Sequence, residues 1–310
     1  MTTTTAVTAP PPDKAGPRAR AGAGLWQAVR GNRKALIGTG ILFLFTVVAA
    51  FPGLFTTVDD PDELNFAPRL GPSTAHLLGT TGLGQDIYSQ LVYGTRESLI
   101  IAVVAGALAT VLSVLIGVSA AYLGGLADDL LSLLTNVVLV IPAFPLVIIL
   151  AKYAGKGSLE VILAVLVLTG WSYGANQMRA QALSLRGRDF LQSARVRGER
   201  RSYIIVREVL PTMTSLIVAN FLGAALYSVL TAAGLQFLGL GDPSSQSWGT
   251  MLYWSQNQQA LQTGTPLWSI APGLCVALLG VAFALVNYAF DEIGNPALRP
   301  VRARKGSRRA

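Results

Sequence analysis

The sequence is poor in charged residues. Only 13% of its 310 residues are Asp, Glu, Lys or Arg, which is about half of the share that soluble domains carry. Apolar side chains make up 52% of the chain, and the mean hydropathy is +0.50. The uncharged runs are longer than the core helices of a globular domain need. An ordinary soluble protein is therefore excluded, and a bilayer is the solvent that these runs fit.

Cysteine and histidine are almost absent. The single cysteine, Cys275, lies in an apolar run, so no disulfide framework is possible, and one histidine with one cysteine cannot build a metal site. His76 is expected to be an ordinary hydrogen-bonded loop residue, because no catalytic triad can be assembled around it. The glycine-rich loop that cradles nucleotide phosphates is missing too, since Gly155-Lys156-Gly157 lacks the upstream glycine and the hydroxyl residue. We expect no catalytic residue, metal or cofactor in this chain.

Six long apolar segments predict an all-α membrane protein with six transmembrane helices. Their approximate bounds are residues 35–55, 98–123, 130–150, 159–172 with an extension as far as 178, 212–235 and 267–290. The third holds fifteen Leu, Ile, Val or Phe residues, which favour its insertion by about 5 to 9 kcal/mol. Pro142 and Pro145 lie in this span, and a packed kink is a simpler interpretation of them than a gate.

The positions of the basic residues predict the orientation. Six Lys and Arg precede the first span, eight lie between the fourth and fifth spans, and six follow residue 295, which makes twenty of the twenty-four. By the positive-inside rule, both termini and the segment between the fourth and fifth spans are cytoplasmic. The same asymmetry accounts for the net charge of +8 without a nucleic-acid partner.

A short helix is predicted at the cytoplasmic surface between the fourth and fifth spans. Asp189 is a good N-cap, and Gln192 lies three residues later, as in a capping box. Gly198 supplies a left-handed C-cap, and residues 203–210 then lead to Pro211, which can open the fifth span. The apolar face of the helix is expected to consist of Phe190, Leu191 and Ala194. The same composition also fits an ordinary basic loop with an interfacial amphipathic helix.

This segment carries the pattern of a known signature. It reads Gln192-Ser193-Ala194, then Gly198, then Leu210-Pro211. It resembles the cytoplasmic signature of permease subunits of binding-protein-dependent ABC importers, of the dipeptide/oligopeptide/nickel type: Glu-Ala-Ala, three further residues, Gly, and Leu-Pro some dozen residues on. The first two letters differ here, whereas the glycine and Leu-Pro match in register. Residues 76–100, 179–189 and 234–252 resemble other parts of the same family, and the resemblance runs from about residue 73 to 299.

The resemblance implies an ABC importer type I permease fold in the bacterial plasma (inner) membrane, with a cytoplasmic coupling helix between helices 4 and 5. It implies four kinds of partner besides lipid: a second homologous permease subunit, two ABC ATPase subunits that bind ATP and Mg, and an extracytoplasmic substrate-binding protein. This chain would then be a translocation subunit and not an enzyme. The residues expected at the ATPase-coupling interface are Asp189, Phe190, Leu191, Gln192, Ser193, Ala194, Arg195, Arg197, Gly198, Leu210 and Pro211.

Four parts of the chain follow from this interpretation. Residues 1–30 are a basic N-terminal tail, expected to be disordered, in which no apolar signal-peptide core is visible. Residues 31–97 hold the first transmembrane helix and an extracytoplasmic segment, and residues 98–295 form the permease core. Residues 296–310 are a basic C-terminal tail.

The extracytoplasmic segment 244–262 is rich in amides and aromatic rings, which suit both peptides and sugars. The residues expected to contact the binding protein or the substrate are Trp248, Tyr253, Trp254, Gln256 and Asn257. The family resemblance favours oligopeptides or dipeptides as substrate, with oligosaccharides such as β-glucosides next and nickel third.

Two other classes of function compete with an importer subunit. An ion-coupled secondary transporter usually has ionisable residues in mid-membrane and inverted repeats, whereas the predicted spans have only Glu160 near an edge and no convincing repeat. A membrane scaffold or lipid-modifying enzyme would need a polar constellation at the bilayer surface, for which the segment 244–262 is the only candidate. Both alternatives fit the sequence less well.

Overall fold

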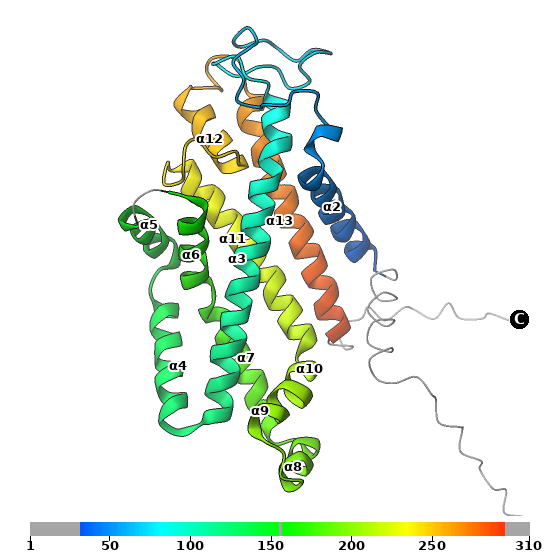
Figure 1. Cartoon of the computed structure of the whole chain (residues 1–310), viewed down its shortest axis with the longest axis vertical. Coiled ribbons are helices and arrows are strands. Elements are labelled where there is room, and N and C mark those ends of the chain that lie inside the picture. Colours follow the sequence, from blue (N-terminus) through cyan, green and yellow to red (C-terminus); the bar gives the residue numbers. More distant parts are fainter. Residues whose placement is uncertain (1–31, 155–156, 295–310) are drawn as a thin grey trace, which may run out of the picture.

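The computed structural model describes residues 32–154 and 157–294, with side chains up to residue 290. Within these ranges every regular element is helical, and the helices form an elongated bundle (Figure 1). The predicted basic tails, residues 1–30 and 296–310, lie outside the described residues.

Four of the described helices are long and apolar enough to cross a membrane alone. They are α2 (Arg33–Ala50), α3 (Ile87–Leu123), α11 (Thr214–Phe237) and α13 (Leu267–Gly294). Two more pass this test only as bent pairs: α4 (Gly125–Val140) with α5 (Ala143–Tyr153), and α6 (Leu159–Gly170) with α7 (Ser172–Arg186). Counting each bent pair as one span gives six, as the hydropathy pattern predicted.

The third span is not one helix. α4 and α5 meet at 91°, a much sharper turn than the packed kink that the sequence suggested. Pro142 cannot donate a main-chain hydrogen bond, and its ring pushes the residue before it out of the helical region. Ile141 accordingly has extended dihedral angles (φ −67°, ψ 128°) and ends α4. The fourth span bends by 40° between α6 and α7, and α7 continues to Arg186, beyond the predicted limit.

α3 begins eleven residues before its predicted start at residue 98. The carboxylate of Asp86 caps it by accepting the main-chain N–H of Ser89 at 2.8 Å. Arg96 and Glu97 lie in the added turns. Because both are charged, the hydropathy pattern did not include this part of the helix in the predicted span. With 37 residues, the helix is about 55 Å long, which exceeds the thickness of a hydrocarbon core.

The bundle buries small side chains and exposes large apolar ones. On α3, Ala102 and Ala105 are fully buried, whereas Val111 and Leu115 are more than half exposed. A Cβ at Gly106 would clash with the backbone of Ala225 in α11. Close packing of small residues, with leucine and valine directed outward, is the arrangement expected of helices surrounded by lipid.

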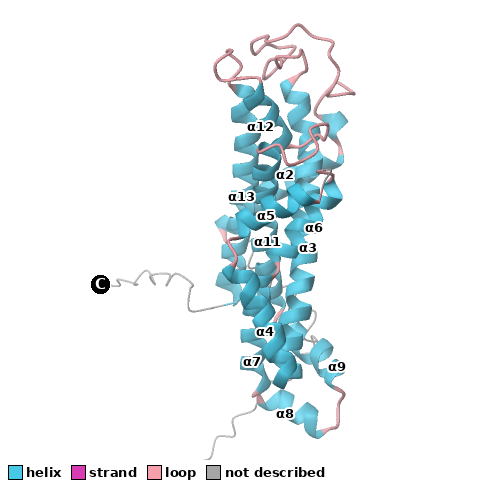
Figure 2. Cartoon of the chain, turned by 90° about the vertical axis from the view of Figure 1, so that its left-hand side faces the viewer, coloured by secondary structure: helices cyan, strands magenta, loops and turns pink. Residues whose placement is uncertain are grey.

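Loops and a short helix cover one end of the bundle, where α12 (Trp248–Asn257) lies beside the first turns of α3 and α13 (Figures 1 and 2). Within these loops the imidazole Nδ1 of His76 lies 2.9 Å from the carboxylate of Asp86. The hydroxyl of Ser89 donates to the same carboxylate at 2.7 Å. His76 is thus a hydrogen-bonded loop residue, as predicted.

The opposite end of the bundle carries the segment between the fourth and fifth spans (Figure 1). It contains α8 (Asp189–Val196), α9 (Arg201–Ile204), a five-residue π-helix (Ile205–Val209) and α10 (Leu210–Thr212). We call these two ends the α12 end and the α8 end.

Candidate functional site

α8 is held to the bundle by a small apolar contact. Leu191 and Ala194 are completely buried, and they join a cluster that includes Met178 of α7 and Val209 and Met213 of the following segment. The remaining positions, Gln192, Ser193, Arg195, Val196 and Arg197, are exposed. An exposed surface on a short helix that is fixed from behind can dock against another protein.

The N-terminus of α8 differs from the prediction. Arg188 occupies the N-cap without a side-chain hydrogen bond, and Asp189 is the first helical residue. Gln192 donates its side-chain N–H to the carbonyl of Gly187 at 3.2 Å instead of closing a capping box. Phe190, predicted on the buried face, is 40% exposed, because the neighbouring elements cover only the sides that carry Leu191 and Ala194.

The C-terminus of α8 agrees with the prediction. Gly198 has φ +78°, in the left-handed region that favours glycine. The N–H of Glu199 donates to the carbonyl of Ala194 at 3.2 Å, and the N–H of Gly198 donates to that of Arg195 at 3.0 Å. These bonds satisfy the last carbonyls of the helix and turn the chain sharply.

A tight helical joint connects this turn to α11. The π-helix provides the wider turn that accommodates Pro211, which cannot donate a main-chain hydrogen bond. The hydroxyl of Thr212 donates to the carbonyl of Val209 at 2.7 Å, and that of Thr214 to the carbonyl of Pro211 at 2.8 Å. Pro211 therefore lies three residues before α11 and does not begin it, although the joint is continuous and well bonded.

An ion pair joins α7 to α4 near the α8 end. The guanidinium of Arg179 donates to both carboxylate oxygens of Asp128, at 2.6 and 2.8 Å. The hydroxyl of Ser132 also donates to this carboxylate at 3.0 Å. About two turns further along α7, Arg186 donates to the carbonyl of Ala121 at 3.3 Å. These bonds attach α7, which leads to α8, to the turn between α3 and α4.

A cavity of about 620 Å³ opens where both bent spans break. Its wall includes residues 138–143 at the α4–α5 bend, residues 169–174 at the α6–α7 bend, and part of α11. Of the described residues that line it, none is charged. Asn220 and Asn287 each have a buried side-chain oxygen without a hydrogen-bond partner among the described residues. The described lining is therefore neutral, and it includes the amide side chains of Gln177, Asn220 and Asn287.

The sequence did not single out these two asparagines. They are 67 residues apart in two apolar spans, and only the packing of α11 against α13 brings both to one cavity. The only pattern that could have indicated them was an isolated amide within a predicted apolar span. The polar residues that the sequence analysis singled out lay in other segments.

The predicted contact residues at the α12 end separate into two groups. Trp248 is completely buried: its main-chain N–H donates to Ser98 and its indole N–H to the carbonyl of Leu91, both at 3.1 Å. It is a core residue and presents no surface to a partner, contrary to the prediction. Trp254, Gln256 and Asn257 are exposed, and Tyr253 is half-buried.

Residues 113–296 match the family described as the binding-protein-dependent transport system inner membrane component. This match covers more than half of the chain and includes both bends, the cavity and α8. The chain belongs to this family. It is a multi-pass membrane protein and a permease subunit, as the resemblance of its motifs predicted.

Similarity to individual permeases extends beyond the matched region. The chain is 31% identical over 276 residues to the oligopeptide transport system permease protein OppC of Mycobacterium tuberculosis, covering 87% of this chain and 93% of that protein. It is 30% identical to the glutathione transport system permease protein GsiD of Pectobacterium atrosepticum, covering 85% and 87%. It is 29% identical to the dipeptide transport system permease protein DppC of Alkalihalophilus pseudofirmus, covering 88% and 89%.

Proposed function

We propose that this permease subunit imports short peptides, as the names of its relatives indicate for those proteins. It pairs with a second homologous permease, and an extracytoplasmic binding protein delivers the substrate. Two ABC ATPase subunits bind ATP and Mg and supply the energy. Oligosaccharides and nickel are weaker alternatives, because none of these three relatives is named for them.

The cavity at the two bends is the share of the translocation path that this subunit contributes. Its volume of about 620 Å³ suits a small ligand. The neutral amides of Gln177, Asn220 and Asn287 line the cavity, and amides can hydrogen-bond to the N–H and C=O groups of a peptide. A neutral lining recognises the main chain of a peptide and is indifferent to the charge of its side chains. The position of this cavity, at both breaks and beside α7, is the observation that carries the proposal.

Force from the ATPases enters through α8, the coupling helix. The exposed face of α8 docks on an ATPase subunit, and its buried face moves α7 and the joint before α11. Because Arg179 ties α7 to Asp128, α4 moves with α7 and the bend at Pro142 changes the shape of the cavity. Such alternation needs a bistable element, and the pair of permeases is that element.

In this arrangement the α8 end is cytoplasmic. The segment from α7 to α10 carries eight arginines within residues 172–211, and this excess favours the cytoplasmic side. Both termini then lie in the cytoplasm, and the α12 end faces the binding protein.

The experiment reconstitutes the complete importer in proteoliposomes and measures uptake of a labelled tripeptide, a cello-oligosaccharide and Ni²⁺. We expect tripeptide uptake that requires ATP and the binding protein. Uptake of a sugar or nickel with no peptide uptake would contradict the substrate. Uptake driven by an ion gradient in liposomes that contain this chain without ATPase subunits would contradict the class of transporter.

A further inference from the structure

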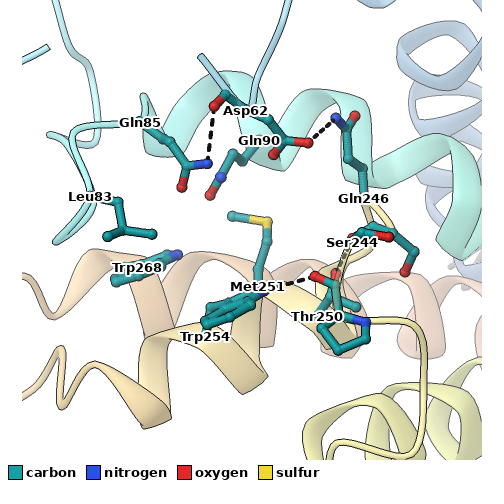
Figure 3. A pocket seen from close by; sticks show the side chains of 12 residues that line it. Asp62, Leu83, Gln85, Gln90, Ser244, Gln246, Thr250, Met251, Trp254 and Trp268 are labelled. Atoms are coloured by element: carbon teal, nitrogen blue, oxygen red, sulfur yellow. Dashed lines mark hydrogen bonds between the residues drawn. The ribbon is translucent and has the colours of Figure 1, made fainter. Parts of the chain in front are cut away.

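A second pocket, of about 200 Å³, lies at the α12 end. Loop residues Asp62 and Gln85, the first turns of α3 and α13, and one side of α12 converge on it (Figure 3). We call it the outer pocket. Its volume is that of one large side chain, and it lies far along the bundle from the cavity at the bends.

The chemistry of the outer pocket is acidic and aromatic. Asp62 supplies a carboxylate, whose Oδ2 accepts a neutral N–H from Gln246 at 3.0 Å. The indole of Trp254 is fixed by donating to the carbonyl of Pro243 at 2.9 Å, and 38% of this side chain stays exposed. None of the twelve described residues that line the pocket is basic. A carboxylate and an indole that line one pocket can both contact a cation that enters it.

A buried indole forms the floor of the pocket. Trp268 is only 2% exposed, and its indole N–H has no hydrogen-bond partner within the described residues. Figure 3 shows its nitrogen on the side of the ring that faces Met251 and the pocket. This N–H has almost no accessible surface, so the ring of Trp268 forms a floor and its N–H is not a contact for an occupant.

The loop beside the pocket is mainly acidic, whereas the nearby basic residue Arg69 lies against Gly82, next to the lining residue Leu83. The segment 56–66 carries four acidic residues and no Lys or Arg, and Asp242 lies next to the pocket residue Pro243. A surface of this kind attracts a basic partner and repels an acidic one.

We propose that the outer pocket receives one lysine or arginine residue of the binding protein that delivers the substrate. The inference rests on the function proposed above. A basic side chain that enters the pocket pairs its cationic head with Asp62 and stacks on Trp254. Arginine in a pocket of this size is a common anchor of protein interfaces.

The test uses the complete importer in nanodiscs and measures the Kd of its cognate binding protein at about 50 mM and about 500 mM salt. We expect Asp62→Asn to raise the Kd about fivefold to tenfold at the lower salt and much less at the higher salt. Trp254→Leu should raise it about fivefold. Asp59→Asn is the matched control, because it removes the same charge from an exposed position on the same loop outside the pocket. Its effect should stay within about twofold.

A double-mutant cycle then identifies the occupant. Each Lys and Arg of the binding protein is replaced by Met in turn, and we expect one replacement that weakens binding to the wild-type importer but not to Asp62→Asn. Equal effects of Asp62→Asn and Asp59→Asn, with peptide uptake intact, would overturn the inference and leave the proposed function standing. An unchanged Kd with altered uptake of lysine-containing peptides would assign the pocket to the substrate and would also overturn it. Failure of the wild-type importer to take up peptide would instead refute the proposed function.

Discussion

The two ends of this bundle are built differently. At the α12 end a buried tryptophan, a capped helix and a network of loop hydrogen bonds hold α2, α3, α12 and α13 together. At the α8 end two buried side chains, Leu191 and Ala194, hold a short helix whose other residues are largely exposed. We therefore expect the α12 end to contribute most to stability, and the α8 end to transmit movement as proposed above. Mutations at the α12 end should mainly lower stability, whereas mutations at the α8 end should mainly reduce transport.

The largest effect on stability is expected from Trp248→Ala. Removing a fully buried indole that packs on Phe45 should cost about 3 to 5 kcal/mol. Thermal unfolding of the detergent-solubilised subunit measures this, with Trp254→Ala, an exposed neighbour on the same helix, as the control. If both variants unfold at the same temperature, the α12 end is not the stable end.

Gly198→Val is expected to impair transport much more than stability. A β-branched residue at φ +78° is strained by about 1 to 2 kcal/mol, and a Cβ at this position would meet no other atom within 4 Å. The variant should insert and fold, while peptide uptake per ATP hydrolysed falls about tenfold as α8 loses its fixed angle. Gly198→Asn is the control, since asparagine tolerates the left-handed region. A wild-type ratio of uptake to hydrolysis in the valine variant would refute the coupling role.

The link between α7 and α4 is tested by Asp128→Asn. The pair is partly exposed, so its loss should cost about 1 kcal/mol and reduce uptake several-fold. The charge-swapped variant Asp128→Arg with Arg179→Asp should recover part of the uptake, whereas Asp129→Asn, an exposed neighbour, should have no effect. No recovery in the swapped variant would mean that the pair does not transmit movement.

The smallest effect is expected in the cavity between the two ends. Asn220→Leu removes one neutral amide from the lining, so uptake should fall about threefold to fivefold. The fall should be the same for peptides that carry lysine, glutamate or alanine side chains, because the described lining is uncharged. Competition uptake assays with three such tripeptides measure this. A loss confined to one charge type would contradict recognition through the main chain.

Much of this fold could be predicted from the sequence, because lipid imposes a simple rule on composition. Hydropathy located the apolar spans, and Gly198 located the end of α8, since only a residue without a side chain adopts that conformation easily. The features that the sequence did not predict depend on contacts between residues that are far apart in the chain. Asp128 and Arg179 are 51 residues apart, and no local pattern pairs them.

Local patterns also failed where packing decides the outcome. Trp248 lies in a segment rich in amides and looks like a surface aromatic, yet α3 and α2 enclose it. Pro142 indicated a break in the third span, but the angle of 91° between α4 and α5 depends on the helices packed around them. Asp189 looked like an N-cap, whereas the chain began the helix one residue earlier than that pattern required.

The unbroken length of α3 has a mechanical consequence. It runs as one helix from the loops of the α12 end to the turn before α4 at the α8 end. There Arg186 donates a hydrogen bond to the carbonyl of Ala121. At Gly117, α3 touches the backbone of Ala175 so closely that any side chain there would clash, so the two helices pack backbone against backbone at this point. We therefore expect α3 and α7 to move together during transport, so that the displacement of α8 proposed above would reach the α12 end through one unbroken helix.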